Sequence, residues 1–285
     1  MWMRTAGANR YANAQERWTI CRGVTNIARR FRPFGRGIPT TSRLWRAYYQ
    51  IFGVPVFRTQ LFWRYVLQFV EGVRVRRWLD VGCGGGAFVV ELARLMPAAS
   101  FVGIDRDSKA IRMANKLASA ARIANVTWEK TELDEFSGGK FDVVSALGLI
   151  ESSPDPATFL ARLADHAQEG GRIIFTAPHA WSVNNIQPAV DHRFSKAQLR
   201  QWMKDIGLQR QIITEGAKGL ALRAYAVSQR LDSPALAAAL YLFTFSLVAL
   251  DPVLPGRGGI LFCAGDVRRR PGNQSGGNSD DSHSR

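Results

Sequence analysis

A glycine-rich turn preceded by an acidic residue is the part of this sequence best suited to chemistry. Residues 78–86 read Trp-Leu-Asp-Val-Gly-Cys-Gly-Gly-Gly, a short apolar run that leads into glycines at positions 82, 84 and 86. Glycine carries no Cβ, so a ligand can approach the backbone closely there. Residues 87–95 have helical periodicity, so the turn also presents free backbone N–H groups at a helix start. This arrangement predicts a nucleotide-like ligand.

Asp80, two residues before the first glycine, indicates which kind of ligand. Gly82, Gly84 and Ala87 also fit the G-x-G-x-x-A pattern of dinucleotide sites, in which a pyrophosphate lies at the helix N-terminus. A carboxylate at position 80 would repel a pyrophosphate, but it suits a cofactor that carries cationic groups and no phosphate. S-adenosylmethionine, with its sulfonium and ammonium groups, is such a cofactor. The alternative is a turn that only connects a strand to a helix.

A second acidic residue, Asp105, ends the apolar run 101–104 and lies 19 residues after Gly86. In a β-α-β unit it is expected at the tip of the second strand, where a carboxylate can accept both hydroxyls of a ribose. Nicotinamide and methionine-derived cofactors both contain ribose, so Asp105 predicts a nucleoside without distinguishing them. The alternative is that Asp105 caps the next helix. Asp107 or Ser108 suits that role better, which leaves Asp105 free.

These motifs resemble those of class I S-adenosylmethionine-dependent methyltransferases over about residues 58–268. Residues 80–86 match the family's first motif, acidic-x-Gly-x-Gly-x-Gly, and Asp105 matches its acidic residue at the second strand end. The resemblance implies a looser motif beside the adenine at Glu132-Leu133, with Asp134 as a competing register. The cofactor-binding residues that it implies are Asp80, Gly82, Cys83, Gly84, Gly86, Asp105, Arg106, Glu132, Leu133 and Leu147.

The resemblance is to the small-molecule branch that includes ubiquinone-biosynthesis methyltransferases. In that branch the fourth strand is usually followed by Leu-Glu-His, whereas this chain has Leu149-Ile150-Glu151-Ser152, without the histidine. The implied fold is α/β. It is a doubly wound, mostly parallel, seven-stranded sheet of the Rossmann-like methyltransferase type, whose last strand, at 259–264, is antiparallel.

Apolar runs that alternate with helical periods support a parallel sheet covered on both faces. The expected strands are 76–81, 100–104, 126–130, 141–146, 171–177 and 209–214, and the expected helices are 58–71, 86–95, 108–121, 155–168 and 195–206. Residues 235–250 form an apolar run shorter than the roughly 20 residues that span a bilayer. We expect a core or lid helix there, with membrane contact as the alternative.

Charge and composition divide the chain into three parts. Residues 1–57 are expected to be a basic, partly disordered or membrane-surface extension, 58–268 the methyltransferase domain, and 269–285 a disordered tail. Residues 1–77 hold 15 Arg and two acidic residues, and so account for +13 of the net +15. Arg-rich segments of this kind can bind anionic membranes, contact nucleic acid, act as organelle presequences or be unselected extensions. Nucleic acid is disfavoured, because no basic-aromatic module recurs.

Glu151 and His179, which follow the expected fourth and fifth strands, are the catalytic candidates. Doubly wound sheets bind their ligands at such strand ends, and either side chain could accept a proton. The alternatives are that Glu151 closes a helix cap and that His179 is merely solvated. His192 is expected to position its loop. Trp181, with Phe194, is expected to line an apolar acceptor pocket.

The leading hypothesis is a cytoplasmic, possibly membrane-peripheral enzyme that methylates oxygen or carbon of a small, apolar or lipid-like acceptor. Nitrogen of a planar base is disfavoured, because Ala146-Leu147-Gly148-Leu149 stands where amino-methylating enzymes carry Asn/Asp-Pro-Pro-aromatic. A nicotinamide-dependent oxidoreductase is disfavoured by Asp80. It is also disfavoured by the lack of a second β-α-β-α-β half after residue 178. The hypothesis from another class is an inactive, methyltransferase-like binding protein.

Overall fold

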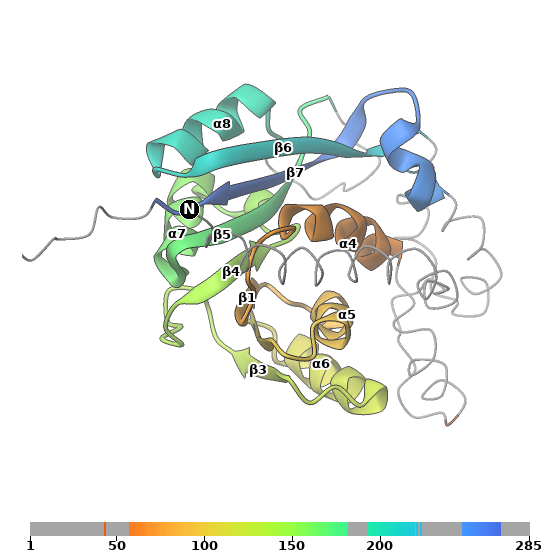
Figure 1. Ribbon diagram of the computed structural model, residues 1–285, viewed down its shortest axis with the longest axis vertical. Helices are drawn as coiled ribbons and strands as arrows, with labels where there is room; N and C mark the ends of the chain where they lie inside the picture. Colours follow the sequence, from red (N-terminus) through yellow and green to blue (C-terminus); the bar gives the residue numbers. More distant parts are fainter. Residues whose placement is uncertain are drawn as a thin grey trace, which may run out of the picture.

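A single seven-stranded sheet forms the centre of the protein (Figure 1). The computed structural model describes residues 43, 57–181, 193–219, 221, 223 and 247–268. The strands lie in the order β3-β2-β1-β4-β5-β7-β6. Their bounds are β1 Arg77–Val81, β2 Ser100–Asp105, β3 Val126–Lys130, β4 Phe141–Ala146, β5 Ala167–Pro178, β6 Gln209–Lys218 and β7 Gly258–Asp266. All neighbouring pairs are parallel except those of β7, which is antiparallel to both β5 and β6. This is the expected methyltransferase arrangement.

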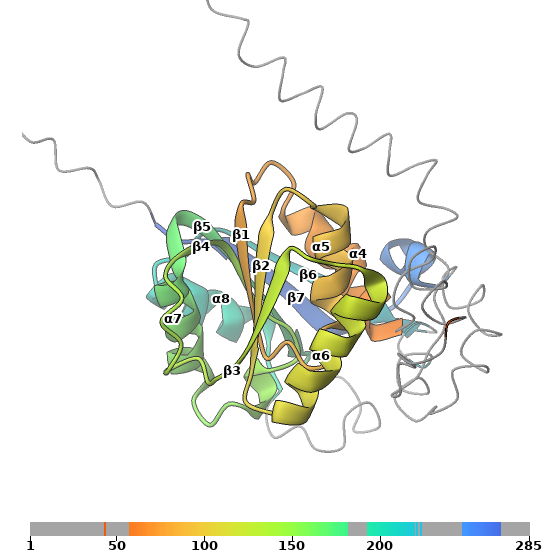
Figure 2. The same ribbon diagram turned by 90° about the horizontal axis from the view of Figure 1, so that it is seen from below.

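Helices cover both faces of the sheet (Figure 2). Three of them, α4 (Phe57–Phe69), α5 (Ala87–Leu95) and α6 (Ser108–Ala121), lie on one face. The other face carries α7 (Pro156–His166) and α8 (Lys196–Asp205). The core is accordingly divided into two main hydrophobic clusters, one on each side of the sheet. Every residue of β4 and β7 is buried, as expected for strands packed on both faces.

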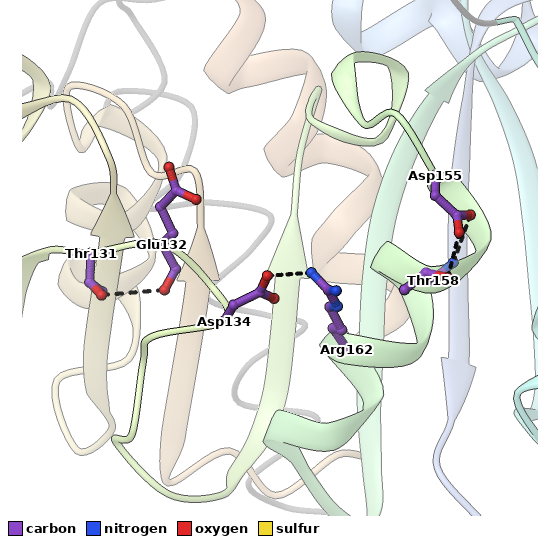
Figure 3. Close-up of polar contacts among 6 residues, drawn as sticks. All are labelled: Thr131, Glu132, Asp134, Asp155, Thr158 and Arg162. Atoms are coloured by element: carbon purple, nitrogen blue, oxygen red, sulfur yellow. Dashed lines mark hydrogen bonds and ion pairs between the residues drawn. The ribbon is translucent and has the colours of Figure 1, made fainter.

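Polar side chains fix where three of these helices begin. Asp107 accepts a hydrogen bond from Lys109 N at 2.8 Å, and Ser195 accepts one from Gln198 N at 3.1 Å. Asp155 does the same for Thr158 N at 3.1 Å, at the start of α7 (Figure 3). Such N-caps satisfy backbone N–H groups that have no partner within the helix. Residues close to each helix start in the sequence therefore determine where α6, α7 and α8 begin.

A buried carboxylate, Asp251, joins three distant parts of the chain. It accepts hydrogen bonds from Tyr65 Oη at 2.5 Å, Ala217 N at 2.8 Å and Lys218 N at 2.6 Å. Ala217 has a φ of 58°, and its N–H and the next form a concave anion-binding turn. Tyr65 also stacks on Phe262, with ring centroids 4.4 Å apart. Asp251 thus fastens α4 and the end of β6 to the segment that leads into β7.

The sequence predicted the elements closely, with differences at their ends. The bounds of α6, β3 and β4 are as expected, whereas β5 begins at Ala167 rather than at 171. The helix expected over 155–168 ends at His166, because Ala167 already pairs with Phe141 of β4. Most of the apolar run 235–250 lies outside the described residues. Its end, 247–250, is helical. Among the described residues, no helix is long and apolar enough to span a membrane.

Candidate functional site

The glycine turn between β1 and α5 adopts a conformation that side chains resist. Gly82, Gly84 and Gly86 have φ values of 68°, 53° and 75°. These lie in the left-handed region, which glycine enters without steric cost. Cys83 N donates to Ile104 O at 3.0 Å, and so attaches the turn to the end of β2. The turn therefore lies at the carboxyl edge of the sheet, where open α/β sheets bind ligands.

The glycines of this turn differ in what surrounds them. A Cβ on Gly82 would lie 2.9 Å from Leu149 Cδ2, one on Gly85 2.2 Å from Met113 Cε, and one on Gly86 2.6 Å from Trp128 Cη2. A Cβ on Gly84 would meet nothing within 4 Å. The sequence argument treated the glycines at 82, 84 and 86 alike, as places for a ligand. In the structure, the space beside Gly84 is open, whereas the spaces beside Gly82, Gly85 and Gly86 are filled by side chains of the protein.

Asp80, the residue on which the choice of cofactor depends, is 3% exposed at the end of β1. Its carboxylate accepts a hydrogen bond from Ser145 Oγ at 2.5 Å. Ser145 in turn accepts from Trp78 Nε1 at 2.7 Å, and it lies beside Asp80 in the register of β1 with β4. Two consecutive hydrogen bonds, from Trp78 to Ser145 and from Ser145 to Asp80, therefore fix the orientation of the Asp80 carboxylate. Ser145 was not among the sequence candidates.

Asp105 lies half-buried at the end of β2 and faces the glycine turn. Its Oδ2 accepts from Gly84 N at 2.8 Å, and its Oδ1 accepts from Asp107 N at 2.8 Å. As expected, Asp107 rather than Asp105 caps α6. Each carboxylate oxygen has a second lone pair, so the hydrogen bonds hold the group in place and leave acceptor capacity for two hydroxyls. Arg106, which follows, is exposed.

Cys83 fills space inside the turn. Its thiol is buried, and its Cβ lies 3.1 Å from where a Cβ on Gly103 would be. Burial raises the pKa of the Cys83 thiol, and the nearby carboxylates of Asp80 and Asp105 raise it further. The group therefore stays a neutral thiol and is no nucleophile. Cys83 therefore contributes packing to the site, and its backbone N–H attaches the turn to Ile104 O of β2.

The segment between β3 and β4 carries the residues predicted to flank the adenine (Figure 3). Asp134 forms an ion pair with Arg162 of α7. The Glu132 carboxylate lies apart from this pair, and Leu133 between them is 8% exposed. Asp134 is thus engaged with α7, whereas the Glu132-Leu133 register stays a prediction.

Residues after β4 connect the glycine turn to β5. Leu149 lies over Gly82, and Gly148 N donates to Thr176 Oγ1 of β5 at 2.7 Å. Leu147, at the end of β4, is 9% exposed. Glu151 lies in the short 3-10 helix η1 (Ile150–Ser152), is 4% exposed, and does not cap a longer helix. This segment lies between the predicted cofactor site and the end of β5.

His179 follows β5 and lies half-buried among charged groups from other elements. Burial lowers the pKa of its imidazole, an effect that nearby Lys196 and Arg257 increase and Glu215 opposes. These charged residues belong to α8, to β6 and to the segment just before β7. The sequence placed His179 and Glu151 in one crevice. The structure places both just beyond the carboxyl ends of neighbouring strands, Glu151 after β4 and His179 after β5, and the charges that act on the His179 imidazole are those of Lys196, Glu215 and Arg257.

Two aromatic residues near His179 have different roles. The Trp181 ring lies 5.9 Å from the His179 ring, centroid to centroid. Phe194 is 1% exposed and packs edge-on against Trp202 at 5.7 Å, so it belongs to the core and does not line a pocket as expected. Its backbone pairs with Pro178 and Ala180. His192 lies outside the described residues.

The residues that the sequence analysis missed share a recognisable signal. Ser145 and Thr176 are hydroxyl side chains within otherwise apolar strands, and both are at most 1% exposed. A buried hydroxyl must find a partner, so an isolated one in an apolar strand suggests a local polar contact. Lys196 and Glu215 carry no such signal, because charged residues at helix starts and on half-exposed strands are common.

Comparison with known proteins identifies the family. Residues 75–223 match a family described as a methyltransferase domain. The ubiquinone biosynthesis O-methyltransferase of Saccharophagus degradans is 33% identical over 158 residues, which are 49% of this chain and 66% of that protein. The protein of that name from Albidiferax ferrireducens is 37% identical over 101 residues, 34% of this chain and 39% of the relative. The chain thus spans only part of the length of these curated relatives.

Solved structures show the same fold at low sequence identity. A Haemonchus contortus phosphoethanolamine N-methyltransferase, solved with S-adenosylhomocysteine, superposes with a TM-score of 0.52 at 16% identity, covering 78% of this chain and 57% of its own. A plantazolicin methyltransferase gives 0.50 at 16% identity over 75% and 84% of the two chains. These likenesses concern the fold alone. Since the family match covers just over half of the 285 residues, the chain belongs to the class I S-adenosylmethionine-dependent methyltransferases and is a distant relative of the ubiquinone-biosynthesis O-methyltransferases.

Proposed function

We propose that this protein binds S-adenosylmethionine at the glycine turn and transfers its methyl group to an oxygen or carbon of a small, apolar acceptor. The observation that supports this most is the bond between the turn and Asp105. Gly84 N–H fixes one oxygen of that carboxylate, and the space at Gly84 is open. A nucleoside whose ribose is bound to Asp105 would lie against the only uncovered glycine among residues 82, 84, 85 and 86.

The residues of the site fit this cofactor in charge as well as in shape. Asp80 and Asp105 place two carboxylates at the turn, which favours a cationic ligand over a diphosphate. When bound, S-adenosylmethionine supplies an electrophilic methyl group on a sulfonium sulfur, a good leaving group. The chain then has to align the acceptor and exclude water. Glu151 and His179 follow the ends of the next two strands, β4 and β5, and we propose that they contact the acceptor.

Equilibrium binding tests the cofactor assignment directly. We expect S-adenosylhomocysteine to bind the full-length chain in the micromolar range and NADH to bind at least about 100-fold more weakly, a difference of about 2.7 kcal/mol. Asp105→Asn keeps the size of the side chain but removes its charge, and should weaken S-adenosylhomocysteine binding about tenfold or more. Asp107→Asn, two residues further along, is the matched control and should leave the affinity unchanged, because Asn can still cap α6. Tighter binding of NADH would refute the proposal.

A further inference from the structure

A serine near the end of the buried strand β4 joins two polar side chains of β1. Ser145 lies beside Asp80 in the parallel register of the two strands, and Trp78 lies two residues before Asp80. Side chains two positions apart on a strand point to the same face of the sheet. On that face Trp78 belongs to the hydrophobic cluster under α4, α5 and α6, and it packs against the rings of Phe88 and Phe101. The three side chains therefore form a polar group within a hydrophobic layer.

The hydrogen bonds within this group run in one direction. An indole N–H can donate but not accept, and an ionised carboxylate can accept but not donate. Trp78 Nε1 lies 2.7 Å from Ser145 Oγ, which lies 2.5 Å from Asp80 Oδ1. The single hydroxyl proton therefore points to Asp80 rather than to Leu79 O, which is 3.4 Å away. A hydroxyl that accepts one hydrogen bond becomes a stronger donor in the next, so the indole strengthens the hold of Ser145 on the carboxylate.

The two donors are fixed by the sheet and by the packing around them. Ser145 and Trp78 are both 0% exposed, and every residue of β4 is buried. Strand β4 is paired on both sides, with Asp80 of β1 beside Ser145 on one side and Ile174 of β5 on the other. A group that is already held in place loses little freedom when a ligand binds. The Asp80 carboxylate is therefore oriented before any ligand arrives.

The two carboxylates beside the glycine turn are held by different kinds of donor. Asp105 accepts from the backbone N–H groups of Gly84 and Asp107, which no side-chain substitution removes. Asp80 accepts from the side chain of Ser145, which belongs to another strand. Asp105, at the end of β2, suits the ribose of a nucleoside cofactor. Asp80, at the end of β1, then suits the cationic, amino-acid end of the same cofactor.

We propose that Ser145 and Trp78 are positioning residues that hold the Asp80 carboxylate toward the α-ammonium group of S-adenosylmethionine. This inference rests on the proposed function. Ser145 acts through Asp80 and is not itself a contact of the cofactor. Recognition of the amino-acid end then depends on one hydroxyl in β4, whereas recognition of the ribose depends on backbone donors. Loss of the hydroxyl should therefore weaken the binding of those ligands that carry the ammonium group, and of no others.

Two ligands that differ by one amino group test this proposal. S-adenosylhomocysteine is compared with its deamino analogue, in which 4-sulfanylbutanoate replaces homocysteine, so that the adenosine, the sulfur and the carboxylate are kept. Calorimetry on the full-length protein should show that S-adenosylhomocysteine binds about 30-fold more tightly than the analogue. Ser145→Ala should weaken S-adenosylhomocysteine binding about tenfold and change the affinity for the analogue by less than about twofold.

Val144→Ala is the matched control, because Val144 is also buried in β4 but belongs to the hydrophobic cluster on the other face of the sheet. It should lower the stability and keep the ratio of the two affinities. Asp80→Asn should remove most of that ratio, since it removes the charge that Ser145 positions. An equal loss for both ligands in Ser145→Ala, or a ratio that survives Asp80→Asn, would overturn the proposal. Failure of both ligands to bind the unmodified protein would instead refute the proposed function.

The Trp78 indole provides a second readout, which a purely structural role would not change. In the unmodified protein, S-adenosylhomocysteine should shift the NMR resonance of the Trp78 Nε1 hydrogen, and the deamino analogue should not. Trp78→Phe assigns this resonance and should weaken S-adenosylhomocysteine binding about threefold. Because Trp78 acts through Ser145, adding Trp78→Phe to Ser145→Ala should cause no further loss of affinity. Additive losses in the double variant, or the same indole shift with both ligands, would contradict the proposal.

Discussion

The glycine turn and the charged group after β5, formed by His179, Lys196, Glu215 and Arg257 and called here the β5 corner, lie at the same edge of the sheet but are built in different ways. In the turn, each carboxylate is held by a neutral donor of the fold, Ser145 Oγ for Asp80 and backbone N–H groups for Asp105. In the β5 corner, charged side chains mostly hold one another, as Lys196 and Glu215 do. The turn and its two carboxylates lie within 26 consecutive residues, 80–105, with a donor to Asp80 supplied by Ser145 of β4, whereas the corner draws on positions from 179 to 257.

This difference shows how one sheet can keep a fixed cofactor site while its acceptor site varies. The backbone N–H groups that hold Asp105 do not change when side chains are substituted, so this part of the site keeps its geometry as the sequence varies. A site made of paired side chains can be altered one residue at a time without disturbing the strands. We therefore expect the turn to determine the cofactor, and the side chains that follow β4 and β5 to determine the acceptor.

The largest expected effect concerns Asp251, which stabilises the corner's side of the sheet but touches neither site. Asp251→Ala leaves Tyr65 Oη and two backbone N–H groups without a buried acceptor. We expect the free energy of unfolding to fall by about 4 kcal/mol, as measured by urea denaturation. Tyr65→Phe, which removes one of the donors, should cost only about 1 kcal/mol. If S-adenosylhomocysteine affinity of the folded variant fell in parallel, the two halves would not be independent.

A pair of glycine substitutions tests the division of roles within the turn. In Gly86→Ala the new Cβ would lie 2.6 Å from Trp128 and 2.8 Å from Ala114, so we expect a loss of about 3 kcal/mol in stability. In Gly84→Ala the space is open, and only the left-handed backbone opposes the side chain, at about 1 kcal/mol. Gly84→Ala should instead weaken S-adenosylhomocysteine binding about tenfold, because its Cβ would face the ligand. Calorimetric binding and thermal unfolding of both variants distinguish these outcomes, and a reversed pattern would contradict the assignment.

Acid should destabilise both halves through one histidine in each. Burial lowers the pKa of His166, beside Phe136 near the predicted adenine segment, and that of His179 in the β5 corner. Below the unfolded-state pKa near 6.5, the unfolded chain takes up protons that the folded chain binds only at lower pH. Stability should therefore fall as pH decreases below about 6.5. His166→Phe and His179→Gln should each flatten part of this slope in denaturation at pH 5 to 7, and an unchanged slope in both would be evidence against buried neutral imidazoles.

The smallest expected effect separates Glu132 from Asp134 in the segment after β3. Asp134→Asn breaks an exposed ion pair with Arg162 and should cost no more than about 0.5 kcal/mol, with no change in cofactor affinity. Glu132→Gln should weaken S-adenosylhomocysteine binding a few-fold and leave stability unchanged. Binding titrations of the two variants settle the register, since the opposite result would place the adenine against Asp134.

Most of the fold could be predicted from the sequence because its signals are local. Strands β3 and β4 and helix α6 were placed to the residue, since apolar runs and capping residues set their ends. The antiparallel seventh strand, however, followed from the family resemblance and not from the pattern. An apolar run such as 259–264 shows that a strand is buried, but its direction depends on contacts with β5 and β6, which are remote in the sequence.

The candidate site divides in the same way. Asp80, Asp105 and the glycines could be identified because their spacing is fixed by one β-α-β unit. Ser145 could not, because its pairing with Asp80 depends on the register of β4 against β1. The expectation for Phe194 was wrong because an aromatic residue near a predicted site looks the same in sequence whether it lines a pocket or fills the core.

The place of β7 in the sheet has a consequence for how the protein is made. Its neighbours, β5 and β6, are both synthesised earlier, yet β7 is inserted between them. Until residues 258–266 leave the ribosome, those two strands therefore face each other across a gap, with unpaired edges that can bind another nascent chain. The glycine turn and its carboxylates are complete by then, so the half of the molecule that we assign to the cofactor can form before the sheet closes.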